Sequence, residues 1–350
     1  MTAAPWRTST GQVLQVESQP TLPGLGGLYA RGAAASGRIA AGRVLPSLPV
    51  IGTARGSSDA EHGEHVLGLP AVALRVTGVP TAGLRGHLHD YQRLLHEPVV
   101  DILPAGYLHV LAFPLATAVM VRSDFPLPLL GMVHLANRVD LNGPVALGDV
   151  LEVRAWAENL TPHRRGVQVD LVAEIWRDGT DGSGRPLWRG VSTYLAKGFT
   201  APDAPGSTSG AEAAGPGQHA ESAGSPVAPG WVAPLPTGRW ALGPGTGRAY
   251  AAVSGDRNPI HLSSLSAKAF GFPRAIAHGM YTAARALADV GQARGETYRW
   301  TVDFSQPVLL PGTVDVAVMP ELSTHPDGFG YVGWNARRGR RHFSGEVVPL

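Results

Sequence analysis

Alternating apolar and polar positions predict strands in the first half of the chain. Residues 151–156 and 167–175 alternate with a period of two, which is the pattern of half-buried β-strands. The turn sequence Gly179–Gly184 precedes a third predicted strand, Leu187–Ala196. The continuous apolar stretch Tyr107–Met120 predicts a buried helix. The first half is therefore expected to place strands around one helix.

The second half contains the same parts in the same order. Its helix is predicted at Met280–Val290, which is rich in Ala and is followed by a glycine at the expected C-terminal cap. Strands are predicted after this helix at Tyr298–Phe304, Thr313–Met319, Tyr331–Ala336 and His342–Val348. Both halves therefore predict an α+β fold.

Two stretches repeat between the halves. Residues 139–147 (VDLNGPVAL) match residues 302–310 (VDFSQPVLL), and in each half a glycine then leads into an alternating strand. Upstream, residues 112–118 can be aligned with residues 277–283, which places Pro114 opposite Gly279. A repeated unit of this size predicts a duplicated domain packed about a pseudo-two-fold axis.

Composition divides the chain into folded and irregular parts. Residues 201–230 contain almost no bulky apolar side chain, so we expect a flexible linker there. Residues 1–65 are rich in Ala, Gly, Pro and Ser and predict a partly irregular arm on the first domain; glycines oppose a weak helical pattern within it at Tyr29–Val44. Residues 66–200 and 231–350 are then the two folded domains.

The overall composition limits the classes of function. With 44% hydrophobic and 16% charged residues, the 350-residue chain is expected to be globular. The 29 Lys and Arg residues balance 27 Asp and Glu residues, so no nucleic-acid partner is expected. The lack of Cys suits a cytoplasmic protein and excludes thiol chemistry. Neither the first ten residues nor the apolar run Val110–Val121 has the pattern of a signal peptide or a membrane span.

Candidate chemistry is concentrated in residues 250–279. A short helix is predicted to end at Gly255, and the following turn, in which Asn258 can bond its own backbone, can hold Asp256 and His261 toward one cavity. Gly279 begins the apolar helix, where its N–H has no intrahelical partner and the missing Cβ allows a ligand oxygen to approach. A carboxylate, an imidazole and such an N–H can move a proton beside an activated carbonyl.

Structural interpretations of these residues compete with the functional one. Asp256 alone is more typical of a turn carboxylate, and His261 alone of a core histidine; their combination with Gly279 favours a site. His278 is treated as structural or as shaping the cavity. The basic run Arg337–Arg341 either receives phosphates of the substrate carrier or forms a solvated turn. The sequence contains no HExxH zinc motif, so no metal is expected.

The string Tyr-x-x-Val-Ser-Gly-Asp-x-Asn-Pro-Ile-His at residues 250–261, followed by Ala-His-Gly-Met at 277–280, resembles the signature of the MaoC-like, or (R)-specific enoyl-CoA hydratase, family. No position of that signature is broken. Through the duplication, the resemblance extends over about residues 65–350. Residues 158–166 and 270–273 also look like those of mycobacterial (3R)-hydroxyacyl-thioester dehydratases of the double-hotdog type.

This resemblance implies a double hotdog, in which two antiparallel sheets each wrap round a central helix. It implies that Asp256 and His261 are the catalytic pair, that the Gly279 N–H is the oxyanion donor, and that Asn258 and Gly255 order the loop. The implied reaction is reversible syn addition of water to a trans-2-enoyl thioester, which gives a (3R)-hydroxyacyl thioester without a cofactor or metal. The implied partner is an acyl-CoA or acyl-carrier-protein thioester, bound by a monomeric pseudo-dimer or a homodimer.

The first domain is expected to be catalytically silent. It lacks a matching Asp–His pair, and Pro114, aligned with Gly279, has no N–H to donate. Phe113, Leu115 and Met120 either line an acyl tunnel or belong to the core. Two alternatives to a dehydratase remain open: a hotdog thioesterase, and a non-catalytic acyl-thioester binding or scaffold protein. The sequence does not identify substrate-binding residues, acyl chain length, carrier or physiological direction.

Overall fold

The computed structural model describes residues 6–44, 68–180, 184–199, 231–320, 322 and 325–350. In the first half, a 3-10 helix, η1 (Ala82–Leu84), and helix α2 (Arg85–Leu95) precede the central helix α3 (Ala105–Met120). The strands of this half are β2 (Val72–Pro80), β3 (Val133–Leu141), β4 (Val150–His163), β5 (Gly166–Arg177) and β6 (Trp188–Lys197).

The second half repeats this plan with two extra short helices. Its strands are β7 (Gly238–Leu242), β8 (Tyr298–Phe304), β9 (Gly312–Pro320), β10 (Phe329–Asn335) and β11 (Arg340–Pro349). Its helices are α4 (Thr246–Ser254), α5 (Pro259–Leu262), α6 (Ser264–Ala269), the central helix α7 (Gly279–Val290) and the 3-10 helix η2 (Gly291–Arg294). The extra helices α5 and α6 lie between α4 and α7.

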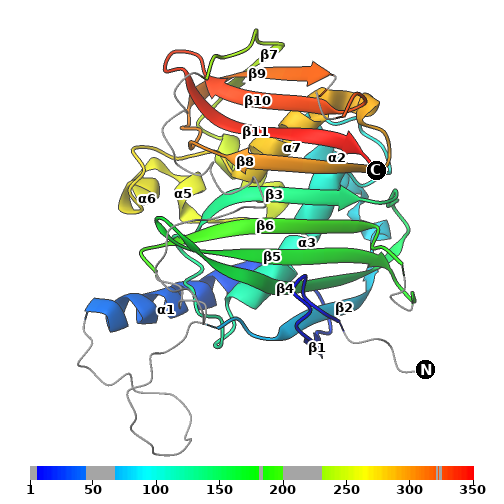
Figure 1. The fold of residues 1–350 in the computed structure, drawn as a ribbon, viewed down its shortest axis with the longest axis vertical. Coiled ribbons are helices and arrows are strands. Elements are labelled where there is room, and N and C mark those ends of the chain that lie inside the picture. The colour runs from blue at the N-terminus through cyan, green and yellow to red at the C-terminus, as the bar shows by residue number, and fades with distance from the viewer. Residues whose placement is uncertain (1–5, 45–67, 181–183, 200–230, 321, 323–324) are drawn as a thin grey trace, which may run out of the picture.

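The strands join into one eleven-stranded sheet in the order β1-β2-β4-β5-β6-β3-β8-β11-β10-β9-β7, where β1 is Gln15–Ser18. From β2 to β7 the neighbours are antiparallel, and the order of the first half is mirrored in the second about the β3–β8 pair. In Figure 1 the strands form the front layer, with α3 and α7 behind them. This is the predicted double-hotdog fold, with the two sheets joined at their edges.

The core lies between each sheet and its central helix. The alternation seen in residues 167–175 places Val167, Val169, Leu171 and Ile175 in the buried interior, as predicted. α3 contacts β2, β4, β5 and β6, whereas α7 contacts β8, β9, β10 and β11. Each helix is therefore covered by the strands of its own half, because its apolar side chains can be removed from water only there.

The strand register confirms the repeat of residues 139–147 and 302–310 but corrects the helix alignment. Leu103 N donates to Val145 O at 2.8 Å, and Ala277 N donates to Val308 O at 2.9 Å. These equivalent bonds place Ala105, the first residue of α3, opposite Gly279, the first residue of α7. The alignment of Pro114 with Gly279 was wrong, since Pro114 lies inside α3. Apolar, Ala-rich helices carry little register information in their sequence.

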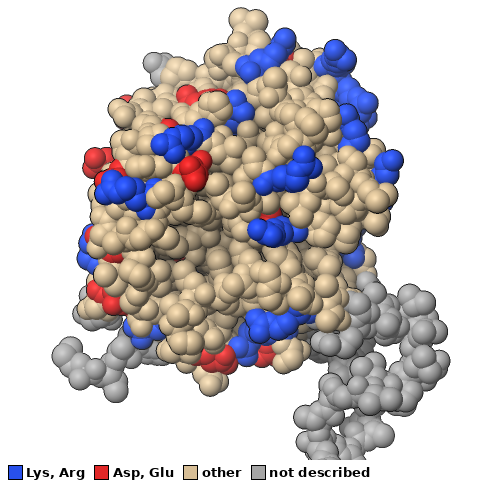
Figure 2. All heavy atoms as spheres, turned by 180° about the vertical axis from the view of Figure 1, so that it is seen from behind, with Lys and Arg blue, Asp and Glu red and all other residues tan. Residues whose placement is uncertain are grey.

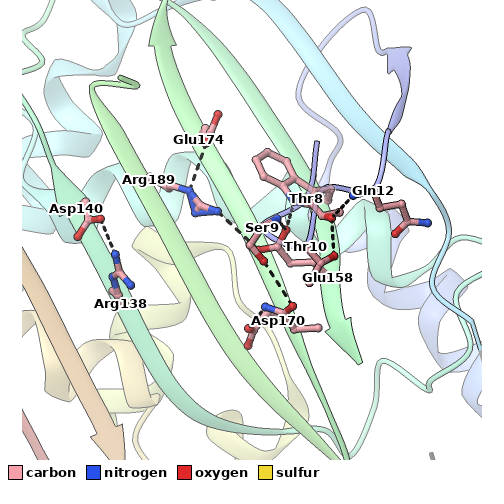
Figure 3. A network of polar contacts seen from close by, with 12 residues as sticks. Thr8, Ser9, Thr10, Gln12, Arg138, Asp140, Glu158, Asp170, Glu174 and Arg189 are labelled. Carbon is pink, nitrogen blue, oxygen red and sulfur yellow. Dashed lines mark hydrogen bonds and ion pairs between the residues drawn. The ribbon is translucent and has the colours of Figure 1, made fainter. Parts of the chain in front are cut away.

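The N-terminal arm crosses to the outer face of the first-half sheet. β1 pairs in parallel with β2, and Ser9 N donates to the buried Glu158 carboxylate at 2.9 Å. The Trp156 indole N–H donates to the same oxygen, also at 2.9 Å. Figure 3 shows this network, which Arg189 continues from Glu158 to Glu174. The described start of the chain is thereby held on the sheet.

Beyond β1 the arm forms helix α1 (Leu25–Val44), so the glycines do not prevent a helix. The arm was expected to lie on the first domain, but α1 also reaches the second half: the Tyr29 hydroxyl bonds Asp256. Gly32 suits this position because a Cβ there would lie 2.4 Å from a Leu129 methyl carbon. The predicted linker, residues 201–230, lies outside the described residues, and no described helix is long and apolar enough to cross a membrane.

Candidate active site

A cavity of about 480 Å³ brings the candidate residues together. Its wall combines side chains from α1, from α3 and the strands of the first half, and from the α4–α7 segment and strands of the second. The lining includes seven large apolar and aromatic residues: Phe113, Met120, Leu129, Met132, Phe270, Phe272 and Phe304. Phe113 and Met120 therefore line the cavity, whereas Leu115 is fully buried in the core.

Asp256 is placed by the end of α4 and the start of α5. Gly255, with φ of +71°, ends α4 in a left-handed conformation. A Cβ at Gly255 would lie only 2.6 Å from a Leu25 methyl carbon, so the position also needs glycine for space. Asn258 is the N-cap of α5, its side chain accepting from Ile260 N, while its backbone N–H donates to Asp256 Oδ1 at 3.1 Å. The turn thus fixes the carboxylate relative to the next helix.

The two imidazoles beside Asp256 lie almost in parallel. The His261 and His278 rings stack with centroids 3.7 Å apart and an interplanar angle of 25°. His261 Nδ1 donates to Ile276 O at 2.9 Å, which assigns the lone pair to Nε2. His278 Nε2 donates to the backbone carbonyl of Asp256 at 3.0 Å and lies 3.8 Å from Asp256 Oδ2. His278 therefore holds the Asp256 loop and also lines the cavity.

Burial and these contacts set the charge of the cluster. Burial opposes ionisation of Asp256, but His278 and His261, which attract the carboxylate when they are protonated, and the hydrogen bonds from Tyr29 and the Asn258 N–H outweigh it and hold the carboxyl pKa below its ordinary value. Burial lowers the pKa of His261 to about 3 and also lowers the pKa of His278. At neutral pH the cluster is consequently one carboxylate beside two neutral imidazoles.

Gly279 begins α7 at the edge of this cluster. As the first residue of the helix, it has an N–H without an intrahelical partner, and it lines the cavity. A Cβ at this position would lie 3.0 Å from the Phe304 ring. The close approach of Phe304 is therefore a second reason for glycine here, beside access to the N–H.

Several cavity residues were missed by the sequence analysis. Tyr29 donates a 2.5 Å hydrogen bond to Asp256 Oδ1 from 227 positions away. His134, which also lines the cavity, stacks on Tyr194 with ring centroids 4.5 Å apart and an angle of 17°, and its ring centroid lies 5.1 Å from that of Phe304. His109 on α3 also lines the cavity. No local motif marks these residues, because strand and helix packing alone brings them to Asp256.

The basic run predicted as either a phosphate contact or a turn forms the turn between β10 and β11. Arg338 N donates to both the backbone and the side-chain oxygen of Asn335, and Gly339 adopts a left-handed conformation with φ of +57°. None of Arg337–Arg341 is among the residues that line the cavity. The solvated-turn interpretation fits this placement.

Asp256, His261 and His278 also form the kind of group that can hold a metal ion. Their potential ligand atoms all lie within 4.8 Å of one another. However, all three residues already have hydrogen-bond partners. His278 Nε2 and His261 Nδ1 each donate to a backbone carbonyl, and Asp256 Oδ1 accepts from Tyr29 and Asn258. The arrangement is that of a hydrogen-bonded acid–base cluster.

Fold and site together define a double-hotdog protein with a carboxylate–imidazole centre, in which the two imidazoles are buried and the carboxylate is half-buried. The profile of the "MaoC like domain" matches residues 231–322, a range that contains Asp256, His261 and Gly279. Over 256 residues the chain is 37% identical to the 3-hydroxyacyl-thioester dehydratase X of Mycobacterium tuberculosis, covering 71% of this chain and 79% of that protein. The chain therefore belongs to the MaoC-like dehydratase family.

Solved structures agree with this assignment. The crystal structure of HtdX of Mycobacterium tuberculosis is similar with a TM-score of 0.64 at 29% identity, covering 79% of this chain and 100% of that chain. A MaoC-like dehydratase of Phytophthora capsici shares the fold at 20% identity with a TM-score of 0.58, covering 81% of this chain and 96% of that chain.

Proposed function

We propose that this protein is a hydro-lyase that interconverts trans-2-enoyl and (3R)-hydroxyacyl thioesters. The observation that carries this proposal is the convergence of Asp256, His261 and the Gly279 N–H on one cavity with an apolar wall. In this proposal residues 231–350 form the catalytic domain and residues 66–200 complete the wall of the acyl site. The dehydratase names of the relatives support the same reaction class.

Asp256 and His261 have the free acceptors that a nucleophilic water needs. The His261 lone pair at Nε2 and Asp256 Oδ2 each accept one O–H of the water, because His261 Nδ1 and Asp256 Oδ1 are already bonded elsewhere. A water held by two acceptors presents an oxygen lone pair to C3 of the enoyl group. As the C3–O bond forms, one of these acceptors removes one of the two protons of the water, and the other proton stays on the new hydroxyl group.

Gly279 supplies the opposite, electron-accepting end of the site. When the C2–C3 π electrons move toward C2, negative charge develops on the thioester oxygen, and the Gly279 N–H at the positive end of α7 stabilises that enolate. The enolate then takes the proton at C2 from the same acid–base pair, and the enolate charge is discharged. Addition of oxygen and hydrogen from one face accounts for a syn product; dehydration is the reverse.

The rim of the cavity suits a phosphorylated carrier. Arg165 and Lys197 line it beside each other, where β5 begins and β6 ends, and Gly198 N donates to Arg165 O at 3.0 Å. Neither side chain forms a salt bridge within the described residues. Figure 2 shows the helix side of the molecule, on which Lys and Arg side chains lie along the upper right edge and near the middle of the face, with Asp and Glu side chains at the left and lower edges. Acyl-CoA and acyl-carrier-protein thioesters both bear a phosphate near such a rim.

The direct test offers the purified protein trans-2-enoyl-CoAs and enoyl thioesters of acyl-carrier protein over a range of chain lengths. Hydration appears as loss of the conjugated enoyl absorbance, and chiral analysis of the product distinguishes the (3R) alcohol. Release of free thiol without hydration would instead indicate a thioesterase. Saturable binding without either change, in a protein of intact fold, would indicate a binding or scaffold protein and contradict the proposal.

A further inference from the structure

Helix α1, near the start of the chain, places the Tyr29 phenol beside the candidate catalytic carboxylate of Asp256. Tyr29 lines the cavity, and its hydroxyl donates to Asp256 Oδ1 at 2.5 Å. The same oxygen accepts the Asn258 N–H at 3.1 Å. Two donors on Oδ1 fix the plane of the carboxylate and leave Oδ2 as the acceptor that faces the imidazole side of the site.

The phenol can act only as a donor in this position. Burial, together with the neighbouring Asp256 carboxylate, raises the Tyr29 pKa well above its ordinary value, so the hydroxyl keeps its proton. A hydrogen bond to an ionised group is stronger than one between neutral groups and favours the charged form. Loss of this donor should therefore make Asp256 easier to protonate.

One face of α1 is fitted to both halves so that Tyr29 stays in place. Leu28 is fully buried, and Leu25 occupies the space left by the missing side chain of Gly255. Two turns along the helix, Gly32 packs against Leu129, and the Ser36 hydroxyl accepts from Leu130 N at 3.2 Å. The helix contacts the Asp256 loop through Leu25, and it contacts the first half through Gly32 and Ser36 on the same face.

The start of the arm is held independently. The Arg154 guanidinium lies 4.1 Å from the centroid of the Trp6 ring, in addition to the β1–β2 pairing and the Ser9–Glu158 bond. The arm is thus attached on the outer face of the sheet and inserts Tyr29 on the cavity side. The arm therefore contacts the first half through Trp6 and Ser9 and the candidate site through Tyr29.

We propose that Tyr29 is a positioning residue for the hydration reaction, which orients Asp256 and keeps it ionised through the hydrogen bond to Oδ1. This inference rests on the proposed function, because it assigns Tyr29 to the same site. Tyr29 acts through Asp256, so it differs from the residues that hold the water. The N-terminal arm is then part of the active site, although it lies outside the matched domain.

The test compares Tyr29→Phe with the parent protein and with Tyr91→Phe. Tyr91 loses the same hydroxyl in the first half, where it is buried and has no hydrogen-bond partner among the described residues. Tyr29→Phe should lower kcat about 10- to 100-fold, the range for one hydrogen bond to a charged group, with a smaller change in KM. The acidic limb of its rate profile should move to higher pH, whereas Tyr91→Phe should leave both unchanged.

A second readout needs no turnover. Because the phenol favours ionised Asp256, the stability difference between parent and Tyr29→Phe should be present at pH 7 and shrink as Asp256 is protonated in acid. A Tyr29 that only fills space would give a melting-temperature difference independent of pH and an unmoved rate profile, which overturns the proposal. A rise in kcat would overturn it too, since the phenol would then be blocking the site. An inactive parent would count against the proposed function alone.

Discussion

In each half a helix ends on a left-handed residue, and an acidic residue follows. His96 and Glu97 occupy these places after α2, and Gly255 and Asp256 occupy them after α4. A tyrosine on the helix then meets a tyrosine of the central helix at nearly the same angle: Tyr91 and Tyr107 at 73°, Tyr250 and Tyr281 at 70°. The two acids therefore stand at equivalent positions of the duplicated fold.

Their surroundings give the two acids opposite roles. Glu97 is buried and forms an ion pair at 2.8 Å with Arg294 of the other half, so its charge is neutralised by that cation. Among the described residues no Lys or Arg pairs with Asp256, whose carboxylate meets neutral donors and lines the cavity. The extra helices α5 and α6 add His261 in the second half, and Pro104 stands where the second half has His278. The two equivalent acids therefore differ in whether their partners leave a carboxylate oxygen free to accept a further hydrogen bond.

The largest effect is expected from exchanging acid for amide at the two equivalent positions. Asp256→Asn and His261→Ala should each lower turnover by about 10²–10⁴, while Glu97→Gln leaves turnover per folded molecule unchanged. The double variant of Asp256 and His261 should be little worse than the poorer single one, because the two residues act on one water. Steady-state rates on an enoyl thioester decide this; equal losses at Glu97 and Asp256 would contradict the division of roles.

The free energy of unfolding should depend more on Glu97 than on Asp256, the reverse of the order expected for turnover. Glu97→Gln leaves the buried Arg294 without its anionic partner, so we expect a loss of about 3–5 kcal/mol in the free energy of unfolding. Replacing both partners, with Glu97→Leu and Arg294→Met, should recover part of that loss because no unpaired buried charge remains. Denaturant unfolding monitored by circular dichroism measures both variants. An unchanged midpoint in Glu97→Gln would mean that the ion pair does not join the halves as described.

The starts of the two central helices offer a third contrast. Gly279→Pro removes the proposed oxyanion donor and should lower turnover by about 10²–10³, whereas Ala105→Pro at the start of α3 should leave turnover per folded molecule intact. Gly279→Ala is the steric control: it keeps the N–H but places the same Cβ 3.0 Å from Phe304. If the Ala and Pro variants lose equal activity, crowding against Phe304 explains the loss, and the N–H is not the donor.

A last contrast concerns acid stability, to which both halves contribute histidines with lowered pKa values. Burial lowers the pKa of His109 to about 4, and the pKa values of His134 and His261 to about 3. Each lies below the unfolded value of about 6.5, so the unfolded chain binds more protons between these limits. Stability is then fully present above about pH 6.5 and falls as the pH drops toward 4, by up to about 1.4 kcal/mol per pH unit for each histidine.

His109→Leu tests the contribution of a first-half histidine to the loss of stability in acid. The variant should show a shallower decline of unfolding free energy between about pH 6.5 and 4, by roughly one histidine's contribution. Denaturant titrations at several pH values provide the slope. An identical slope in parent and variant would show that His109 is not held neutral by burial.

The sequence by itself determined the features that depend on short stretches of chain. The turn from Gly255 to His261 is built from its own caps and Asn–Pro chemistry, so the pairing of Asp256 with His261 could be predicted. The alternating strands and the repeat at residues 139–147 and 302–310 were likewise visible, because side-chain period and turn geometry are local. The resemblance of residues 250–261 to a family signature also predicted the double-hotdog fold.

Only the tertiary structure decided how distant segments meet at that turn. Tyr29 reaches Asp256 through a glycine-containing helix whose sequence opposed a helix, because packing of Leu28 and Gly32 outweighs weak propensity. Ala105 rather than Pro114 corresponds to Gly279, since backbone bonds to the adjoining strand segment set the start of each central helix. Leu115 faces the core while Phe113 and Met120 face the cavity, which depends on the covering strands rather than on apolarity.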